Sequence, residues 1–142
     1  MSICVYGRIN KKCIDENCFE KMLVDFFLPK NDIIKKNNKE SVTYEEISDG
    51  NQIIISFVNE KKPPYNVYDS SIINDEYEYM QLIIFDIMKE EASIDKYKTI
   101  INFCVYLKQK IESAILITSD VYDEICLLKE QDVIWSKNFT II

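Results

Sequence analysis

Apolar and polar residues along this chain alternate with several different periods, and each period predicts a different kind of secondary structure. At residues 93–112, apolar side chains recur at spacings of three and four, and Ser93 is a residue type that caps helix starts. A second run with helical spacing covers residues 15–28 and ends before Pro29. We therefore expect two main helices, each with one apolar face that packs on a sheet.

Short runs rich in β-branched and aromatic residues predict the strands. The run at 80–88 is apolar at nearly every position, so its periodicity does not separate a buried strand from a buried helix, and its isoleucines favour the strand. A hairpin of 125–128 and 133–136 closes the pattern, and Trp135 is expected to pack on the core. The other predicted strands are 2–9, 41–48, 52–59 and 114–118, with Asp49-Gly50-Asn51 as the turn between the second and third of these.

Together these elements predict a single α+β domain that covers residues 1–142. We expect a mixed sheet that carries both helices. Within it, residues 80–118 form a strand–helix–strand unit whose two strands run parallel with a right-handed crossover. Hydrophobic residues make up 47% of the chain, which is sufficient for a core without disulfide bonds or a structural metal.

Two polar segments interrupt the regular pattern. Residues 30–41 are expected to form a loop, and a basic patch that binds anions is the functional alternative. Residues 60–78 contain Pro63-Pro64, which excludes a helix interior or a central strand there. Tyrosines and acids are interspersed in this second segment, so it is either a solvated connector or a protein-binding surface. The lysines of the first segment are Lys30, Lys35, Lys36 and Lys39.

The net charge of −7 arises entirely in the second part of the chain. Residues 1–62 hold ten basic and ten acidic side chains, whereas residues 63–142 hold seven basic and fourteen acidic ones. Affinity for nucleic acid requires Lys and Arg to displace phosphate counterions, so we expect no nucleic-acid partner. The acidic excess favours a basic protein partner, and the alternative is that it serves only solubility.

Several kinds of catalytic or cofactor site need residues that the chain lacks. It contains no histidine, which excludes Ser-His-Asp and Cys-His catalysis and histidine metal sites. No glycine-rich phosphate-binding motif is present, and none of the five cysteines has zinc-site spacing. We expect reduced cysteines, no cofactor and no enzymatic activity. A cytoplasmic protein without membrane contact is expected, because the chain has neither a signal-peptide pattern nor an apolar run that could span a bilayer.

The main candidate site follows the predicted strand at 114–118. Asp120, Asp123 and Glu124 lie where the carboxyl ends of strands in open α/β sheets bind ligands. Three interpretations are open: a solvated turn, an acidic patch that binds a partner, or a Mg²⁺ site that also includes Asp86. The residues expected to form a partner-binding surface are Asp69, Asp75, Glu76, Glu78, Asp120, Asp123, Glu124, Tyr65 and Tyr68.

Three functional classes fit these features. The first is a protein-binding module. The second is a small enzyme that uses carboxylates, with or without a metal, or the thiols of Cys4, Cys13 or Cys18. The third is a structural or oligomeric subunit. The first class is favoured because the usual catalytic side chains are missing, and we expect a monomer or a homodimer.

In its general build, and in the segment AILITSDVYDEICLL at 114–128, the chain resembles the immunity proteins of bacterial contact-dependent growth inhibition and polymorphic toxin systems. The resemblance extends over about 80–135 and implies a cytoplasmic antitoxin. Such a protein binds one cognate toxin domain, often a basic nuclease, and neutralises it by occluding its active site. The resemblance assigns no individual residue a role, so the candidate surface rests on charge clustering alone.

Overall fold

The computed structural model describes residues 2–27, 32–37, 42–48, 51–88 and 93–139. Two helices, α1 at Glu16–Phe27 and α2 at Ile94–Lys110, confirm the two helical predictions. The strands are β1 (Ser2–Ile9), β2 (Asp32–Asn37), β3 (Val42–Ser48), β4 (Asn51–Val58), β5 (Val67–Ser70), β6 (Asp75–Glu78), β7 (Gln81–Met88), β8 (Ile115–Ser119), β9 (Asp123–Lys129) and β10 (Asp132–Trp135).

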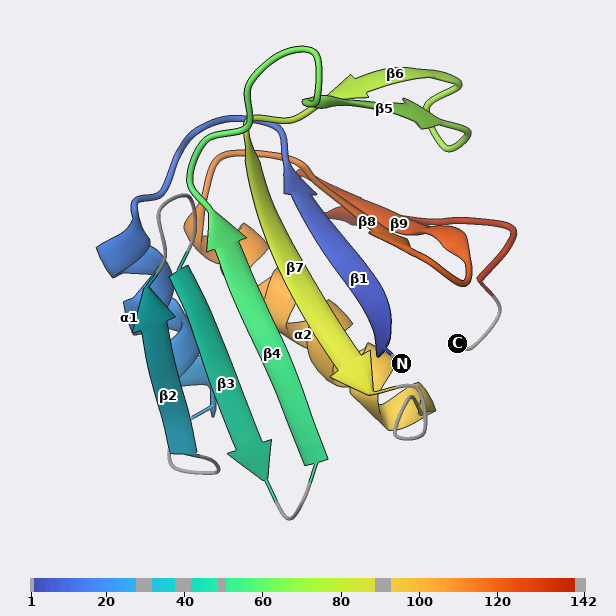
Figure 1. Ribbon diagram of the computed structural model, residues 1–142. Coiled ribbons are helices and arrows are strands. Elements are labelled where there is room, and N and C mark those ends of the chain that lie inside the picture. The colour runs from blue at the N-terminus through green and yellow to red at the C-terminus, as the bar shows by residue number, and fades with distance from the viewer. Residues whose placement is uncertain (1, 28–31, 38–41, 49–50, 89–92, 140–142) are drawn as a thin grey trace.

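Eight strands form one sheet in the order β10-β9-β8-β1-β7-β4-β3-β2, and β5 and β6 form a separate hairpin (Figure 1). The α+β class is therefore confirmed. Neighbouring strands are antiparallel at every described pairing, so the sheet is antiparallel where a mixed sheet was expected. β7 and β8, which flank α2, do run parallel, but β1 lies between them and pairs with both. This is a split β–α–β unit, and a crossover pattern in the sequence does not reveal the inserted strand.

The helices cover one face of the sheet, and the main hydrophobic core lies between them and the strands (Figure 1). Phe19 of α1 stacks on Phe57 of β4 with ring centroids 4.5 Å apart, and Phe103 of α2 meets Phe19 edge-on at 5.9 Å. Alternate residues of β1, including Val5 and Ile9, are fully buried in this core. The aromatic contacts join both helices to the sheet and contribute a large buried apolar area.

The opposite face, which we call the open face, carries the β5–β6 hairpin at one end (Figure 1). Tyr77 of β6 packs against this face, and its hydroxyl donates to the carbonyl oxygens of Arg8 and Ala114 at 2.8 and 3.1 Å. These bonds attach the hairpin to β1 and to the start of β8. A second, smaller apolar cluster results, and its buried members are Tyr77, Tyr79, Leu82, Leu116 and Leu127.

The loop predicted at 30–41 is wrong in part, because the segment contains β2, which pairs with β3 at one edge of the sheet. Edge strands tolerate lysine and lack the apolar pattern of central strands, so the sequence DIIKKN gives a weak signal. Lys30 and Lys39 lie outside the described residues. The basic patch therefore stays an untested alternative.

The segment at 60–78 is more regular than the sequence predicts, because it contains the β5–β6 hairpin. Its four-residue strands are too short and too polar to give a strand pattern.

The expectation that Trp135 packs on the core is also wrong in part. Its side chain is 37% exposed and stacks on Phe139, with ring centroids 6.0 Å apart.

Local hydrogen bonds account for the starts of both helices. The Cys18 backbone N–H donates to Asp15 Oδ1 at 2.7 Å, and this bond lowers the pKa of Asp15. The Lys96 N–H donates to the Ser93 hydroxyl at 3.4 Å in the same way.

Neither of the two described helices has the length and apolar character that a bilayer crossing requires.

Candidate functional site

A buried carboxylate joins the two segments that the sequence singles out as acidic. Glu124 of β9 is only 4% exposed, and its two oxygens accept hydrogen bonds from the Ser70 hydroxyl at 2.6 Å and the Ser71 backbone N–H at 2.5 Å. The β8–β9 register shifts between Ile117, which lies opposite Cys126, and Thr118, which lies opposite Glu124. The bonds bring the β5–β6 hairpin against the turn between β8 and β9.

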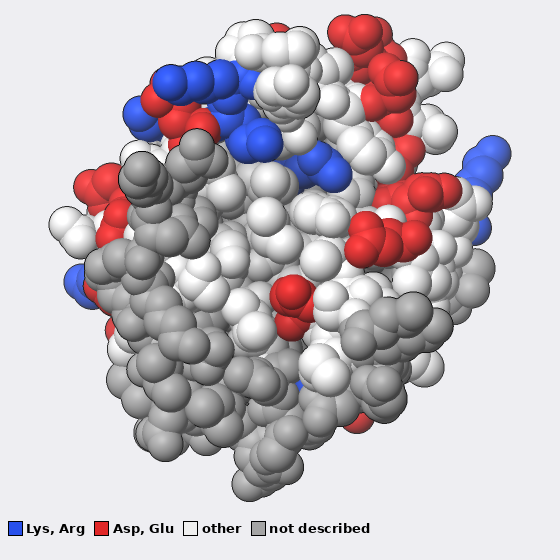
Figure 2. Space-filling model, in the orientation of Figure 1, with Lys and Arg blue, Asp and Glu red and all other residues white. Residues whose placement is uncertain are grey.

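The remaining acids of these segments are exposed on both sides of the Glu124 contact. Asp69 lies directly opposite Glu76 in the hairpin, and Asp75 comes one position before Glu76. Asp123, at the start of β9, adopts a left-handed backbone conformation with φ of 60°. None of these four carboxylates forms an ion pair with a described residue. Figure 2 shows acidic side chains gathered along one side of the open face.

Asp120 belongs to the same side of the molecule but is partly engaged. Its carboxylate accepts from the Cys4 backbone N–H at 3.0 Å and from the Tyr6 hydroxyl at 3.3 Å. Cys4 lies opposite Asp86 in the β1–β7 pairing, so Asp86 and Asp120 flank one thiol on the open face. We call Asp69, Asp75, Glu76, Asp120 and Asp123 the acidic surface.

Burial and the neighbouring carboxylates keep the Cys4 and Tyr6 side chains protonated. Burial first, and then the charge of Asp86, raises the pKa of the Cys4 thiol. Burial also raises the pKa of Tyr6 to about 12, with further contributions from Cys4 and Asp120. A thiol with a raised pKa is a poor nucleophile near neutral pH, so this pair favours a structural role over a catalytic one.

The three remaining predicted residues have different surroundings. Glu78 is exposed at the other end of β6, opposite Val67, and accepts from the Asn66 side chain at 3.5 Å. Tyr65 is 74% exposed in the connector before β5. Tyr68 is half-buried, and its ring lies 4.6 Å from the Arg8 guanidinium. Of the nine predicted surface residues, the structure therefore places Glu124 inside the protein and Tyr68 partly inside.

Arg8, which lies among three tyrosine rings on the open face, was not identified from the sequence. Its guanidinium carbon lies within 5.0 Å of the ring centroids of Tyr6, Tyr68 and Tyr79, and it donates to the Tyr79 hydroxyl at 2.7 Å and to Thr118 Oγ1 at 3.1 Å. The alternation of buried and partly buried residues along β1 could have predicted part of this arrangement, because it places Tyr6 and Arg8 together on the face opposite Val5.

The alternative metal site does not form as the sequence suggests. The charges of Asp86 and Asp120 both raise the pKa of the Cys4 thiol, but the Glu124 carboxylate is bonded to Ser70. Among the described residues, no three Cys, Asp or Glu side chains gather closely enough to hold a metal ion. The acidic interpretation therefore has more geometric support than the metal one.

The remaining thiols differ in accessibility. Cys13 and Cys18 are exposed, while Cys104 and Cys126 are buried in the core, and all five cysteines are free. Burial raises the pKa of Cys104 and Cys126, and burial likewise raises the pKa of Cys13. Charged side chains lie near both exposed thiols: the Asp15 carboxylate is hydrogen-bonded to Cys18, and Lys11 and Lys108 partly offset the effect of burial on the pKa of Cys13.

Comparison with known proteins identifies no relative. The chain matches no protein-family model, no curated protein and no solved structure. Its function must therefore be argued from the acidic surface and from the fold that holds it.

Proposed function

We propose that this protein is an immunity protein that binds a basic toxin domain, such as a nuclease, and neutralises it by covering its active site. One observation carries the proposal. The acidic β5–β6 hairpin and the acidic start of β9, more than 50 residues apart, are held together by the Glu124–Ser70 contact, and their exposed carboxylates form no ion pair with a described residue. Like charges placed together destabilise a fold, and a cluster of this kind is suited to attracting a basic partner.

The acidic surface would act by charge complementarity. Carboxylates that face a nuclease would occupy the positions where the phosphates of its substrate bind, and substrate would be excluded. Long-range attraction would also speed the encounter, which matters for an antitoxin that must bind before damage occurs. Tyr65, the most exposed tyrosine for which exposure is described, would supply apolar contact area beside the charges.

The test begins with the genes that flank this chain: a C-terminal toxin domain encoded there is expressed together with this protein in a protection assay, and binding kinetics are then measured on the purified pair. The triple variant Asp75→Asn, Glu76→Gln, Asp123→Asn should lower the association rate about tenfold at low salt and flatten its dependence on ionic strength. The matched control, Asp25→Asn, Asp95→Asn, Glu112→Gln, removes the same charges from α1, from α2 and from the residues that follow α2.

The two triple variants separate the outcomes. Loss of protection in the first variant and normal protection in the control would support the proposal. Equal association rates and equal salt dependence in both would contradict the acidic surface as the binding site. Full toxicity in the presence of the unmodified protein would contradict the immunity function itself. The alternatives are then a small carboxylate-based enzyme and an oligomeric subunit.

A further inference from the structure

The last strand of the sheet exposes an apolar edge that the acidic surface does not use. β10 forms one end of the eight-stranded sheet and pairs, among the described strands, with β9 alone. Three consecutive apolar residues are exposed on it: Val133 at 40%, Ile134 at 43% and Trp135 at 37%. Edge strands are usually protected by charge, proline or a covering element, so this edge is unusually receptive to another strand.

The backbone register shows which groups of β10 are available. The Ser136 N–H donates to the Ile125 carbonyl at 2.9 Å, so residue 136 directs its backbone groups towards β9. In an antiparallel ladder this direction alternates, so Ile134 also bonds towards β9, opposite Leu127. Val133 and Trp135 therefore direct their N–H and C=O groups away from the sheet, where a further strand would pair.

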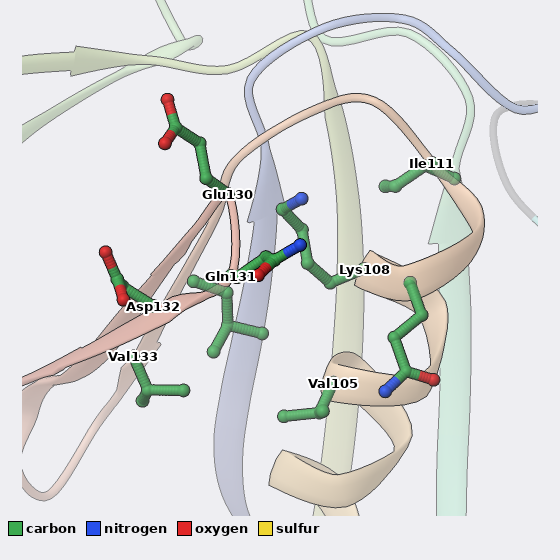
Figure 3. Close-up of a pocket in the computed structure, with 9 residues that line it drawn as sticks. Val105, Lys108, Ile111, Glu130, Gln131, Asp132 and Val133 are labelled. Carbon is green, nitrogen blue, oxygen red and sulfur yellow. The ribbon is translucent and has the colours of Figure 1, made fainter.

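Two cavities open beside these same residues, between β10 and α2. The larger has a volume of about 620 Å³ and the smaller about 340 Å³, and both are lined by Val105 of α2 and Val133 of β10. Figure 3 shows Val105 and Val133 pointing towards each other across the larger one, whereas Asp132 and Glu130 point away from the helix. A residue paired opposite Val133 or Trp135 projects to this side of the sheet, at the mouths of the cavities.

We propose that the β10 edge binds an extended segment of a partner protein, which adds as a ninth, antiparallel strand. The segment has apolar side chains at the two positions opposite Trp135 and Val133, and these reach the cavities. It has a basic side chain at the position opposite Asp132, where Glu130 adds a second negative charge. The proposal does not depend on the acidic surface, which lies around the β5–β6 hairpin.

A second copy of this chain fits the same edge less well. In the second copy, Val133 and Trp135 line the cavities of that copy. They would therefore not fill the cavities of the first copy, and a pair of copies would leave the cavities open. The strand is also only four residues long, and pairing two such strands buries little more than their backbones. An extended peptide has no such constraint, because its side chains are free to enter the cavities.

The chain offers a direct readout, because Trp135 is its only tryptophan. The probe is the synthetic peptide acetyl-Thr-Val-Thr-Val-Lys-Thr-amide, which places valines opposite Trp135 and Val133 and lysine opposite Asp132. Saturable binding should shift the Trp135 emission to shorter wavelength. Hydrogen exchange should slow at the Val133 and Trp135 amides and stay unchanged at Ile134, whose amide is already bonded to β9. A peptide with serine in place of both valines is the matched control and should not bind.

A proline at Val133 tests the edge itself. Val133→Pro removes an N–H that points away from β9, so the β9–β10 ladder keeps its bonds, and peptide affinity should fall at least tenfold. Ile134→Thr is the control variant, and its affinity should stay within about twofold because the outward backbone groups remain. If Val133→Pro does not fold, the exchange pattern of the unmodified protein decides the question.

Three outcomes would overturn the proposal. The first is equal binding of the peptide by Val133→Pro and the unmodified protein. The second is slowed exchange at Ile134 without slowing at Val133 and Trp135. The third is an emission shift that follows protein concentration without peptide, with dimers in sedimentation, because the edge would then bind a second copy.

Discussion

The carboxylate of Glu124 and the hydroxyl of Ser70, 54 residues apart in sequence, form a 2.6 Å hydrogen bond inside the protein. A charged group with so little solvent contact is stable only when its oxygens are bonded, and Ser70 and Ser71 supply the bonds. The same contact positions the acidic surface. The contact between the β5–β6 turn and β9, and with it the binding proposed for this protein, should therefore depend on Glu124, whereas Tyr77 holds the hairpin to β1.

Glu124→Ala should detach the hairpin from β9. Loss of two hydrogen bonds to a carboxylate is expected to lower the free energy of unfolding by about 2–4 kcal/mol. The β5–β6 segment should also become the first site of limited proteolysis. Urea denaturation and protease mapping measure both effects. Asp123→Asn, at the exposed neighbour, should change stability by less than about 0.5 kcal/mol, and a larger effect there would weaken the assignment.

Gln81 should be among the least replaceable polar residues. Its side chain is fully buried, donates to the Ile14 carbonyl at 2.7 Å and to Asn59, and accepts from the Cys13 N–H at 3.1 Å. Gln81→Leu leaves these backbone groups without partners and should destabilise the protein by about 2–4 kcal/mol. Thermal and urea unfolding provide the measurement. A neutral effect would mean that water replaces the side chain.

Glu76→Lys should stabilise the protein. Glu76 faces Asp69 across the hairpin, so a lysine converts a repulsive pair into an attractive one. The expected gain is about 0.5–1 kcal/mol in urea denaturation at low salt, and it should shrink as salt is added. Glu112→Lys, outside the acidic surface, serves as the control. A gain in stability with a loss of toxin binding is the pattern expected of residues kept for function.

Alkaline pH should destabilise the fold through its buried thiols. Burial raises the pKa of Cys126 from 9.0 to about 12, so the native state holds this proton more tightly than the unfolded chain. The resulting stabilisation is complete below about pH 9 and is lost as the pH rises towards 12. Each such thiol adds a slope of about 1.4 kcal/mol per pH unit in this window. Urea titrations should show a shallower slope for Cys126→Ala, and an identical slope would contradict the assignment.

Elements with strong periodicity could be predicted from the sequence. α2 begins and ends within two residues of its expected limits, because Ser93 caps it and its buried face repeats at helical spacing. For β7, only the isoleucines favoured a strand over a helix, and the structure confirms the strand. β2 could not be predicted, since an edge strand with lysines lacks the alternation that identifies strands.

The candidate site was predictable in composition but not in assembly. The charge pattern identifies both acidic segments, the one at 60–78 and the one after 114–118, but no feature of either segment indicates that they contact each other. Glu124 shows why. Glu124 and Asp123 are adjacent acids that the sequence does not distinguish, and the β8–β9 register shift and the contact with the β5–β6 hairpin determine that Glu124 is the buried one. Arg8 was missed because its role depends on three tyrosines that are distant in sequence or on alternate positions.

The position of β1 has a consequence for how the chain acquires its structure. β1 is synthesised well before both of its neighbours, β7 and β8, with Ser2 opposite Met88 and Val5 opposite Ser119. During translation β1 must therefore remain without these partners until β7, and then β8, has left the ribosome. The central pairings join residues far apart in sequence, a topology associated with slow folding. Ribosome-bound chains that end before α2 lack β8, β9 and β10, so one edge of β1 should stay unpaired and should be captured by chaperones that bind exposed strands.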